Sequence, residues 1–258
     1  MNEPRVVLCM KWGTLYSAEY VNVLYQACRA HISGDFQFVC LTNEERGLMP
    51  EVQVRSIPEI GLNEWHYYNG AWPKLGVFSH LLYGLEGRAL FIDLDSVICG
   101  SLDEMFDVPG ALVAMDSSPW KRKPSSPRTM SSVFAFNLGS LGWIVDRFIS
   151  DRDEFVKKYG IEQDYLHGEV PSITYWPQEW IVSFKYHLRQ PLIIDRFREP
   201  RQPPSTAKIV AFHGLPRPID LIRPLNRNWD RFPHHGAGVV SWMEKYWQKF
   251  GGQIRSMP

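Results

Sequence analysis

The sequence predicts an α/β fold with a mixed, mainly parallel, Rossmann-like sheet in a single domain. Short apolar runs typical of strands alternate with segments of helical spacing through the first half of the chain. This alternation is typical of parallel sheets with crossover helices. Polar residues also follow several of these runs directly, as expected where strands end at a ligand-binding edge.

The composition is that of a globular protein with a substantial core. The chain has 258 residues, of which 45% are hydrophobic and 22% charged, and its 28 basic and 28 acidic residues give no net charge. This balance gives no reason to expect nucleic acid as a partner. No apolar run approaches the ~20 residues of a membrane-spanning helix, so no transmembrane segment is predicted, while peripheral membrane contact stays open.

The start of the chain and its cysteines favour a cytoplasmic protein. Residues 1–4 lead straight into the first apolar run, without the long apolar region of a signal peptide. The four cysteines stand in or beside apolar stretches and form no C-x-x-C pair. Free buried thiols are therefore expected.

The elements expected in the first part of the chain are three strands and two helices. In chain order they are a strand at 5–10, a helix at 17–32, strands at 36–41 and 52–57, and a helix at 75–85. The first helix is predicted from apolar residues that recur on one helical face. The second is predicted to stop at Gly87.

The rest of the chain is less regular. The elements expected there are strands at 88–92, 111–115 and 132–136, and helices at 141–159 and 239–250. Residues 117–130 are rich in proline, serine and basic side chains, including Lys121, Arg122 and Lys123, and are predicted to form a loop.

Two carboxylates follow the strand predicted at 88–92, in the sequence Asp93-Leu94-Asp95. Residues i and i+2 of a strand point the same way, so both carboxylates can face one cation. Oxygen ligands of this kind suit Mg²⁺ or Mn²⁺ that carries a phosphate. Two solvated acids at a strand end are the alternative for an isolated D-x-D.

Further polar side chains end apolar strands and are expected at the same edge, namely Lys11, Thr42, Asn43, Asp116, Asn137 and His213. With the two aspartates, the His213 imidazole would complete a facial set of metal ligands. Lys74 and Arg217 would neutralise the charge of a bound phosphate.

The order of these motifs resembles the GT-A glycosyltransferases, and most closely the retaining glycosyltransferase family 8 of glycogenin and lipopolysaccharide galactosyltransferases. The matching segments, spread over residues 5 to 220, are Met10-Lys11-Trp12-Gly13, Leu41-Thr42-Asn43, Trp72-Pro73-Lys74-Leu75, Phe91-Ile92-Asp93-Leu94-Asp95, Asp116, Phe136-Asn137-Leu138-Gly139, Glu162-Gln163-Asp164-Tyr165-Leu166 and Phe212-His213-Gly214-Leu215-Pro216-Arg217-Pro218. Glu162 replaces the first aspartate of the family's D-Q-D, and Arg217 replaces a lysine.

The resemblance implies a GT-A type single domain, 1–258. About residues 1–110 would form the nucleotide-binding half, and about 111–258 would bind donor sugar and acceptor. It implies metal-dependent transfer of a sugar, with retention, from a nucleotide-diphosphate sugar, with a UDP-sugar favoured. The acceptor would be a carbohydrate or glycolipid.

The resemblance also assigns residues to these roles. The metal, Mn²⁺ or Mg²⁺, would be held by Asp93, Asp95 and His213. The donor would be bound by Lys11, Trp12, Thr42, Asn43, Lys74, Asp93, Asn137, Glu162 and Arg217. Gln163, Asp164 and Asp116 would act at the reacting sugar.

Two other functions remain open. A phosphatase of the haloacid dehalogenase class also ends a strand in D-x-D, and aspartyl-phosphate formation would indicate it. A non-catalytic nucleotide-sugar-binding protein could share the fold, and donor binding without turnover would indicate that.

Overall fold

The computed structural model describes residues 3–120, 127–224, 228–236 and 238–254. Two compact units divide the chain. Unit 1 consists of Met1–Tyr16, Ser33–Asp93 and Asp103–Trp176, and unit 2 consists of Ser17–Ile32, Leu94–Leu102 and Pro177–Pro258. The single domain with a nucleotide-binding half of about residues 1–110 stays a prediction.

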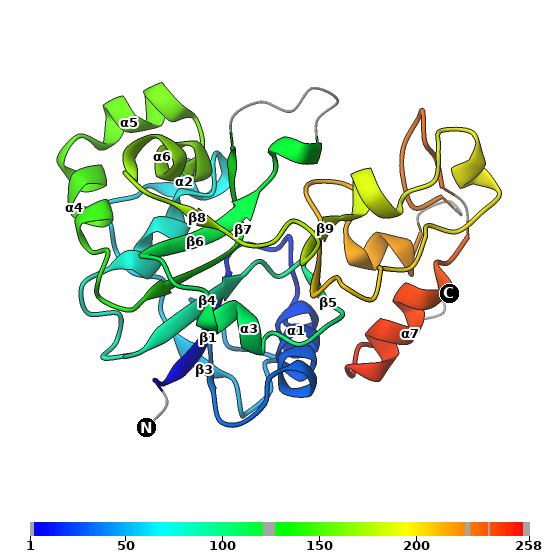
Figure 1. Cartoon of the computed structure of the whole chain (residues 1–258), viewed down its shortest axis with the longest axis horizontal. Helices are drawn as coiled ribbons and strands as arrows, with labels where there is room; N and C mark the ends of the chain where they lie inside the picture. Colours follow the sequence, from blue (N-terminus) through cyan, green and yellow to red (C-terminus); the bar gives the residue numbers. More distant parts are fainter. Residues whose placement is uncertain (1–2, 121–126, 225–227, 237, 255–258) are drawn as a thin grey trace. The chain divides into compact units, whose positions relative to one another are not determined.

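Unit 1 is built on a seven-stranded sheet with the order β3-β2-β1-β4-β7-β6-β8 (Figure 1). Its strands are β1 (Arg5–Lys11), β2 (Gln37–Thr42), β3 (Gln53–Arg55), β4 (Arg88–Ile92), β6 (Leu112–Asp116), β7 (Thr129–Asn137) and β8 (Thr174–Tyr175). The first four run parallel, β7 is antiparallel to both neighbours, and β6 is parallel to β8. The predicted mixed, mainly parallel sheet is confirmed.

The core of unit 1 explains why β1, β2 and β4 are nearly continuous apolar runs, since strands buried on both faces have no solvent side. Aromatic rings fill the space beside the sheet. The Trp72 ring stacks on Phe148 with centroids 5.2 Å apart, and Phe91 stacks on Phe134 at 4.8 Å. These side chains are almost wholly buried.

Three helices of unit 1 pack together, α4 (Trp143–Ser150), α5 (Arg152–Tyr159) and α6 (Glu162–Glu169) (Figure 1). The single helix predicted at 141–159 is therefore two helices. Asp151 separates them, because its φ of −150° and ψ of 45° leave the helical region.

The helix predicted at 75–85 is wrong. A 3-10 helix, η1 (Trp72–Phe78), stands there and is followed by turns. Leu75, Phe78 and Leu82 are all buried, so their spacing imitates a helical face. Tyr83 has a φ of 56°, which ends any regular helix at that point.

Unit 1 also contains α2 (Glu64–Tyr68), α3 (Asp103–Asp107) and the 3-10 helix η2 (Ser118–Trp120). Of the loop predicted at 117–130, residues 121–126, with Lys121, Arg122 and Lys123, lie outside the described residues.

Unit 2 holds a three-stranded sheet of β5 (Val97–Ile98), β10 (Ile209–Ala211) and β9 (Ile181–Ser183). Its helices are α1 (Ala18–His31), α7 (Ser241–Lys249), one turn of π-helix η3 (Phe184–Leu188), and the 3-10 helices η4 (Ile194–Arg196) and η5 (Pro218–Leu221). Glu19 of α1 accepts hydrogen bonds from Arg223 and from the Trp247 indole, at 2.8 and 2.9 Å. The helices predicted at both ends of the chain are confirmed.

The cysteines are free thiols, as predicted. Cys9 of β1 lies opposite Cys40 of β2 in unit 1. Cys28 and Cys99 belong to unit 2. Among the residues that the structure describes, no helix is both long and apolar enough to cross a bilayer.

Glu169 at the end of α6 supports the helix cluster through a pH-sensitive network. Its carboxylate accepts hydrogen bonds from Arg147, Lys158 and Tyr159. Burial alone would raise its pKa, but these bonds outweigh burial and lower the pKa to about 2. The stabilisation is complete above the ordinary pKa of 4.5 and is lost as the pH falls toward 2.

We therefore expect Glu169→Gln to lower the free energy of unfolding by about 1–2 kcal/mol at pH 7, and by almost nothing near pH 2. Urea unfolding at a series of pH values measures the difference. Glu154→Gln on the exposed side of α5 is the control and should change little at any pH. A difference for Glu169→Gln that persists unchanged at low pH would contradict this account.

Candidate functional site

One edge of the unit 1 sheet collects polar side chains. Lys11 is the last residue of β1 and lies opposite Thr42, the last residue of β2. Asp93 directly follows β4, which is parallel to β1. Because β4 and β6 are both antiparallel to β7, Asp116 at the end of β6 lies at the same edge. The shared edge predicted for these residues is confirmed.

The prediction that Asn137 lies at this edge is wrong. Asn137 ends β7 and is paired with Arg88, the first residue of β4, so it lies at the opposite edge. Its Oδ1 atom accepts a hydrogen bond from Arg88 Nη1 at 2.8 Å. The start of β7 lies at the polar edge instead, where the Ser132 carbonyl accepts from the Asp93 N–H at 2.8 Å.

A hollow of about 200 Å³ lies beyond the ends of β1 and β2, lined by Lys11, Trp12, Gly13, Thr42, Asn43, Glu44, Ile57 and Tyr67. Four predicted donor-binding residues thus lie together. Hydrogen bonds fix the walls: the Trp12 indole donates to the Tyr67 carbonyl at 2.7 Å, and Lys11 Nζ lies 2.7 Å from Glu44. The Trp12 and Tyr67 rings pack edge to face, with centroids 6.5 Å apart, and a flat ring can lie beside them. The space is smaller than the ~300–1,000 Å³ typical of pockets for larger ligands.

A buried charge cluster stands at the end of β4. Lys74 Nζ lies 2.7 Å from the Asp93 carboxylate and 3.6 Å from Glu162. The Ser131 hydroxyl donates to Glu162. Burial raises the pKa of Asp93 and of Glu162, and Lys74 opposes this in both. Two carboxyl groups face one ammonium group, and a bound cation would favour the ionised form of both.

The first turn of α6 carries Glu162, Gln163 and Asp164. Asp164 lies 3.1 Å from Arg128 Nη2, and the backbone N–H of Arg128 donates to Asp116 Oδ1 at 2.9 Å. Arg128 therefore links two predicted catalytic acids, while Gln163 is half-buried beside them. Arg128 was not singled out from the sequence, because only the start of β7 at residue 129 fixes its place.

Asp95, a predicted metal ligand, and Arg217, a predicted phosphate contact, both lie in unit 2 near Tyr20. Asp95 and Arg217 both act electrostatically on its phenol, whose pKa is raised mainly by burial. Arg217 Nη2 also lies 3.2 Å from Asp220. The sequence indicated Tyr20 only as part of the apolar face of a helix.

His213 follows β10 in unit 2. Its Nε2 atom lies 2.8 Å from the Ser183 hydroxyl, and its ring stacks on Tyr186 with centroids 5.6 Å apart. Burial, aided by Lys185, lowers the pKa of His213 to about 4, so the imidazole is neutral at pH 7. The neutral ring is the form that binds metal ions.

The predicted metal ligands belong to different units, Asp93 to unit 1 and Asp95 and His213 to unit 2. Within the described ranges, no three His, Cys, Asp or Glu side chains form a ready-made metal group. Mg²⁺ commonly binds through one or two carboxylates together with substrate phosphates, rather than in a full protein cage. Asp93 in unit 1 and Asp95 in unit 2 each carry an oxygen ligand of that kind.

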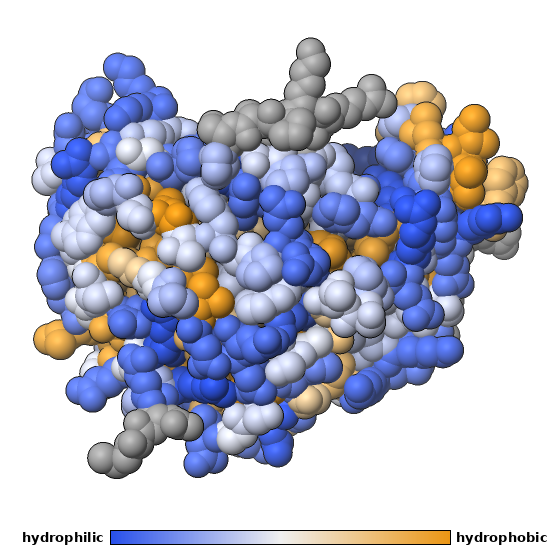
Figure 2. Space-filling view, in the orientation of Figure 1, coloured by the Kyte–Doolittle hydropathy of each residue, from blue (hydrophilic) through white to orange (hydrophobic). Residues whose placement is uncertain are grey.

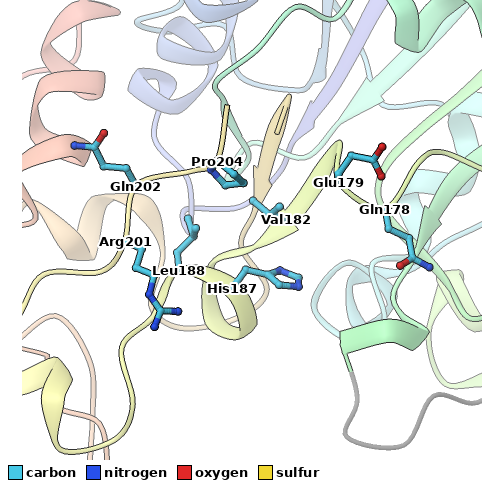
Figure 3. A pocket seen from close by; sticks show the side chains of 8 residues that line it. All are labelled: Gln178, Glu179, Val182, His187, Leu188, Arg201, Gln202 and Pro204. Atoms are coloured by element: carbon cyan, nitrogen blue, oxygen red, sulfur yellow. The ribbon is translucent and has the colours of Figure 1, made fainter. Parts of the chain in front are cut away.

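A second hollow, of about 560 Å³, lies in unit 2 (Figure 3). Its lining consists of Gln178, Glu179, Val182, His187, Leu188, Arg201, Gln202 and Pro204. The His187 Nδ1 atom accepts the Ser183 N–H at 2.8 Å, and burial lowers the pKa of this imidazole. The neutral ring therefore carries its proton on Nε2. Amide, carboxylate, imidazole and guanidinium groups together suit a ligand rich in hydroxyl or phosphate groups.

Solved structures of glycosyltransferases share this fold. The galactosyltransferase LgtC, in complex with donor and acceptor sugar analogues, matches with a TM-score of 0.60 and 15% identity, over 98% of this chain and 97% of that chain. The bifunctional WbbM matches at 0.57 and 14%, over 84% of this chain and 47% of its own. GlyE of Streptococcus pneumoniae TIGR4 matches at 0.57 and 12%, over 98% and 62%.

No protein-family model matches the sequence, and a search of curated proteins finds no match. The predicted GT-A type fold is confirmed by the structural likeness.

Proposed function

We propose that the protein is a glycosyltransferase that moves a sugar from a nucleotide-diphosphate sugar, with a UDP-sugar favoured, to a carbohydrate or glycolipid acceptor. One observation carries the proposal: the aromatic hollow beyond β1 and β2 and the charge cluster after β4 lie at the same edge of one sheet. In open α/β sheets, ligands bind at the carboxyl ends of the strands.

The two features suit different parts of such a donor. The hollow takes the base against Trp12 and Tyr67, with Thr42 and Asn43 beside the ribose. The Lys74 ammonium group then donates one hydrogen bond to a phosphate oxygen and another to Asp93. The hollow alone is too small for the whole donor, so the diphosphate and sugar extend beyond it.

A divalent cation, Mn²⁺ or Mg²⁺, is part of the proposal because a diphosphate would otherwise bring its negative charge beside carboxyl groups with no further cation to balance it. Asp93 and Asp95 would ligate it, with His213 as a third ligand and Arg217 as a further phosphate contact. When bound, the cation stabilises the charge on the leaving diphosphate.

The acids of the polar edge would orient the reacting sugar. Glu162, Asp164 and Asp116 accept hydrogen bonds from sugar hydroxyls, and Arg128 holds the last two acids in place. The neutral amide of Gln163 is a poor nucleophile, so transfer with retention would follow a front-face route. The bond from the anomeric carbon to the phosphate oxygen breaks, a bond to the acceptor oxygen forms on the same face, and the acceptor proton passes to the leaving phosphate.

A cytoplasmic location is proposed on the four free thiols, which are typical of a reducing compartment.

A panel of UDP-, GDP- and CMP-sugars with Mn²⁺ tests the function, with thermal unfolding and nucleotide release as readouts. We expect one donor at saturating concentration to raise Tm by about 5 °C or more. Asp95→Asn should weaken that donor at least about tenfold, because its carboxylate is a proposed ligand. Asn137→Ala, at the opposite edge, is the matched control and should bind the donor like the wild type.

Failure of every donor to bind would overturn the proposal. Hydrolysis of phosphate esters that Asp93→Asn abolishes would indicate a phosphatase instead. Donor binding with no nucleotide release in the presence of any acceptor would indicate a non-catalytic binding protein.

A further inference from the structure

Large apolar side chains project into solvent from two loops of unit 2. On the first loop, Ile193 is 73% exposed and Phe197 is 81% exposed. Leu192 and Ile194, on either side of Ile193, are also exposed. Phe232 on the second loop is 81% exposed. Figure 2 shows hydrophobic side chains gathered with hydrophilic ones over this part of the molecule. Apolar groups concentrated in this way mark interaction sites more often than scattered single residues do.

The first of these loops is closed at its base. The Arg201 N–H donates to the Leu188 carbonyl at 2.7 Å, and the Gln190 amide donates to the Glu199 carbonyl at 2.9 Å. Both bonds close the same loop, and the exposed apolar residues lie within it. Arg201 also lines the 560 Å³ hollow, so a guanidinium-lined space lies at the base of the loop.

A hydrogen bond and an ion pair, both to buried side chains, connect the second loop to the first. His234 Nδ1 lies 2.9 Å from Asp195, whose side chain is completely buried. Arg189 forms an ion pair with Asp230 and lies over the Trp229 ring, 5.2 Å from its centroid. Among the described residues, Asp195 Oδ1, Arg189 Nε and Arg189 Nη2 form no hydrogen bond, so apart from the His234 hydrogen bond the loops are held together by charge contacts and the ring contact. The exposed apolar side chains at the tips of the two loops (the apolar tips) therefore stand on loops that are tied to each other.

The charge around the apolar tips is positive. The exposed basic residues of the two loops are Arg196, Arg198, Arg201 and Arg231. In the part of the chain that the structure describes, none of these four guanidinium groups forms an ion pair. The acids of the loops are already engaged, since Asp195 and Asp230 pair as above, and Glu199 accepts from the Ser241 hydroxyl and N–H at 2.7 and 3.0 Å.

We propose that these residues, Leu192, Ile193, Ile194, Arg196, Phe197, Arg198, Arg231 and Phe232, form a lipid-docking surface that binds an anionic bilayer. Aromatic and aliphatic tips bury themselves among headgroups and upper acyl chains, while arginines pair with lipid phosphates. Separate apolar side chains on two loops, surrounded by four exposed arginines and one exposed acid, Glu199, suit a fluid, negatively charged surface. The proposal does not depend on the proposed sugar transfer.

Sedimentation with lipid vesicles tests it on the full chain. We expect the wild type to sediment with phosphatidylcholine vesicles that contain phosphatidylglycerol, much less with phosphatidylcholine alone, and less as salt is raised. The double variant Phe197→Ser, Phe232→Ser should bind at least about tenfold more weakly. Arg196→Gln with Arg198→Gln should weaken binding and reduce its salt dependence.

Leu81→Ser is the matched control, because Leu81 is 86% exposed but lies in unit 1. It should bind vesicles like the wild type. Thermal unfolding of each variant should match the wild type, since every substituted side chain is exposed.

Three results would overturn the proposal. One is equal binding of the wild type to neutral and anionic vesicles, and another is undiminished binding by the phenylalanine and arginine variants. The third is a wild-type dimer, seen by sedimentation equilibrium without lipid, that the phenylalanine variant dissociates. That result would assign the surface to a second copy of the chain.

Discussion

Replacing Lys74 by methionine is expected to lower the free energy of unfolding by about 3 kcal/mol. The ammonium group is the counter-charge that the structure shows for Asp93 and Glu162, and the Lys74 and Glu162 side chains are only 10% and 4% exposed. Methionine fills a similar volume but leaves two buried carboxyl groups without that charge. Protonation of one of them, which their raised pKa values favour, limits the loss.

Urea unfolding at pH 7 measures this effect, and Lys158→Met is the matched control. Lys158 also pairs with a carboxylate, Glu169, at 3.0 Å, but its side chain is 60% exposed. Solvent screens an exposed pair, so its loss should change the free energy of unfolding much less. Equal effects of the two substitutions would show that the buried cluster does not hold ionised groups.

Glu162→Gln is expected to separate stability from activity. The amide oxygen still accepts from the Ser131 hydroxyl, so the packing stays intact. Burial makes the ionised form of Glu162 the costly one, as its raised pKa indicates, so the free energy of unfolding at pH 7 should stay the same or rise. Turnover should fall about a hundredfold, because the neutral amide holds sugar hydroxyls less strongly than a carboxylate does.

The kinetic readout is kcat for nucleotide release with the donor found in the panel, together with KM for that donor. We expect kcat to fall more than KM rises, because the lost interaction acts on the reacting sugar. Glu154→Gln, an exposed change of the same chemistry, should leave both constants unchanged. Full turnover by Glu162→Gln would remove this residue from the site.

The strands at the polar edge could be predicted from the sequence because burial on both faces gives an unmistakable apolar run. Residues Lys11, Thr42, Asp93 and Asp116 were placed correctly for this reason. The direction of a strand leaves no such signal. The run that ends at Asn137 is as apolar as its neighbours, yet it runs antiparallel and carries Asn137 to the far edge.

Residues whose role depends on contacts between distant segments were also missed. Ser131 and Arg128 lie at the site only because β7 starts there and α6 packs against it. Asp195 and His234 brace two loops across 39 positions of sequence, and no local pattern indicates that pairing. Propensity and periodicity report burial and local conformation, whereas these contacts are fixed by tertiary structure.

Each unit contains two buried or half-buried thiols, whose reaction with an alkylating reagent would show when that unit opens. Only a thiolate reacts readily with alkylating reagents, and burial raises the pKa of Cys28 and raises that of Cys99 to about 12. Cys9 and Cys40 report on the sheet of unit 1, and Cys28 and Cys99 report on unit 2. The order in which mass spectrometry finds them labelled would therefore reveal which unit loosens first, with donor, with lipid, or alone.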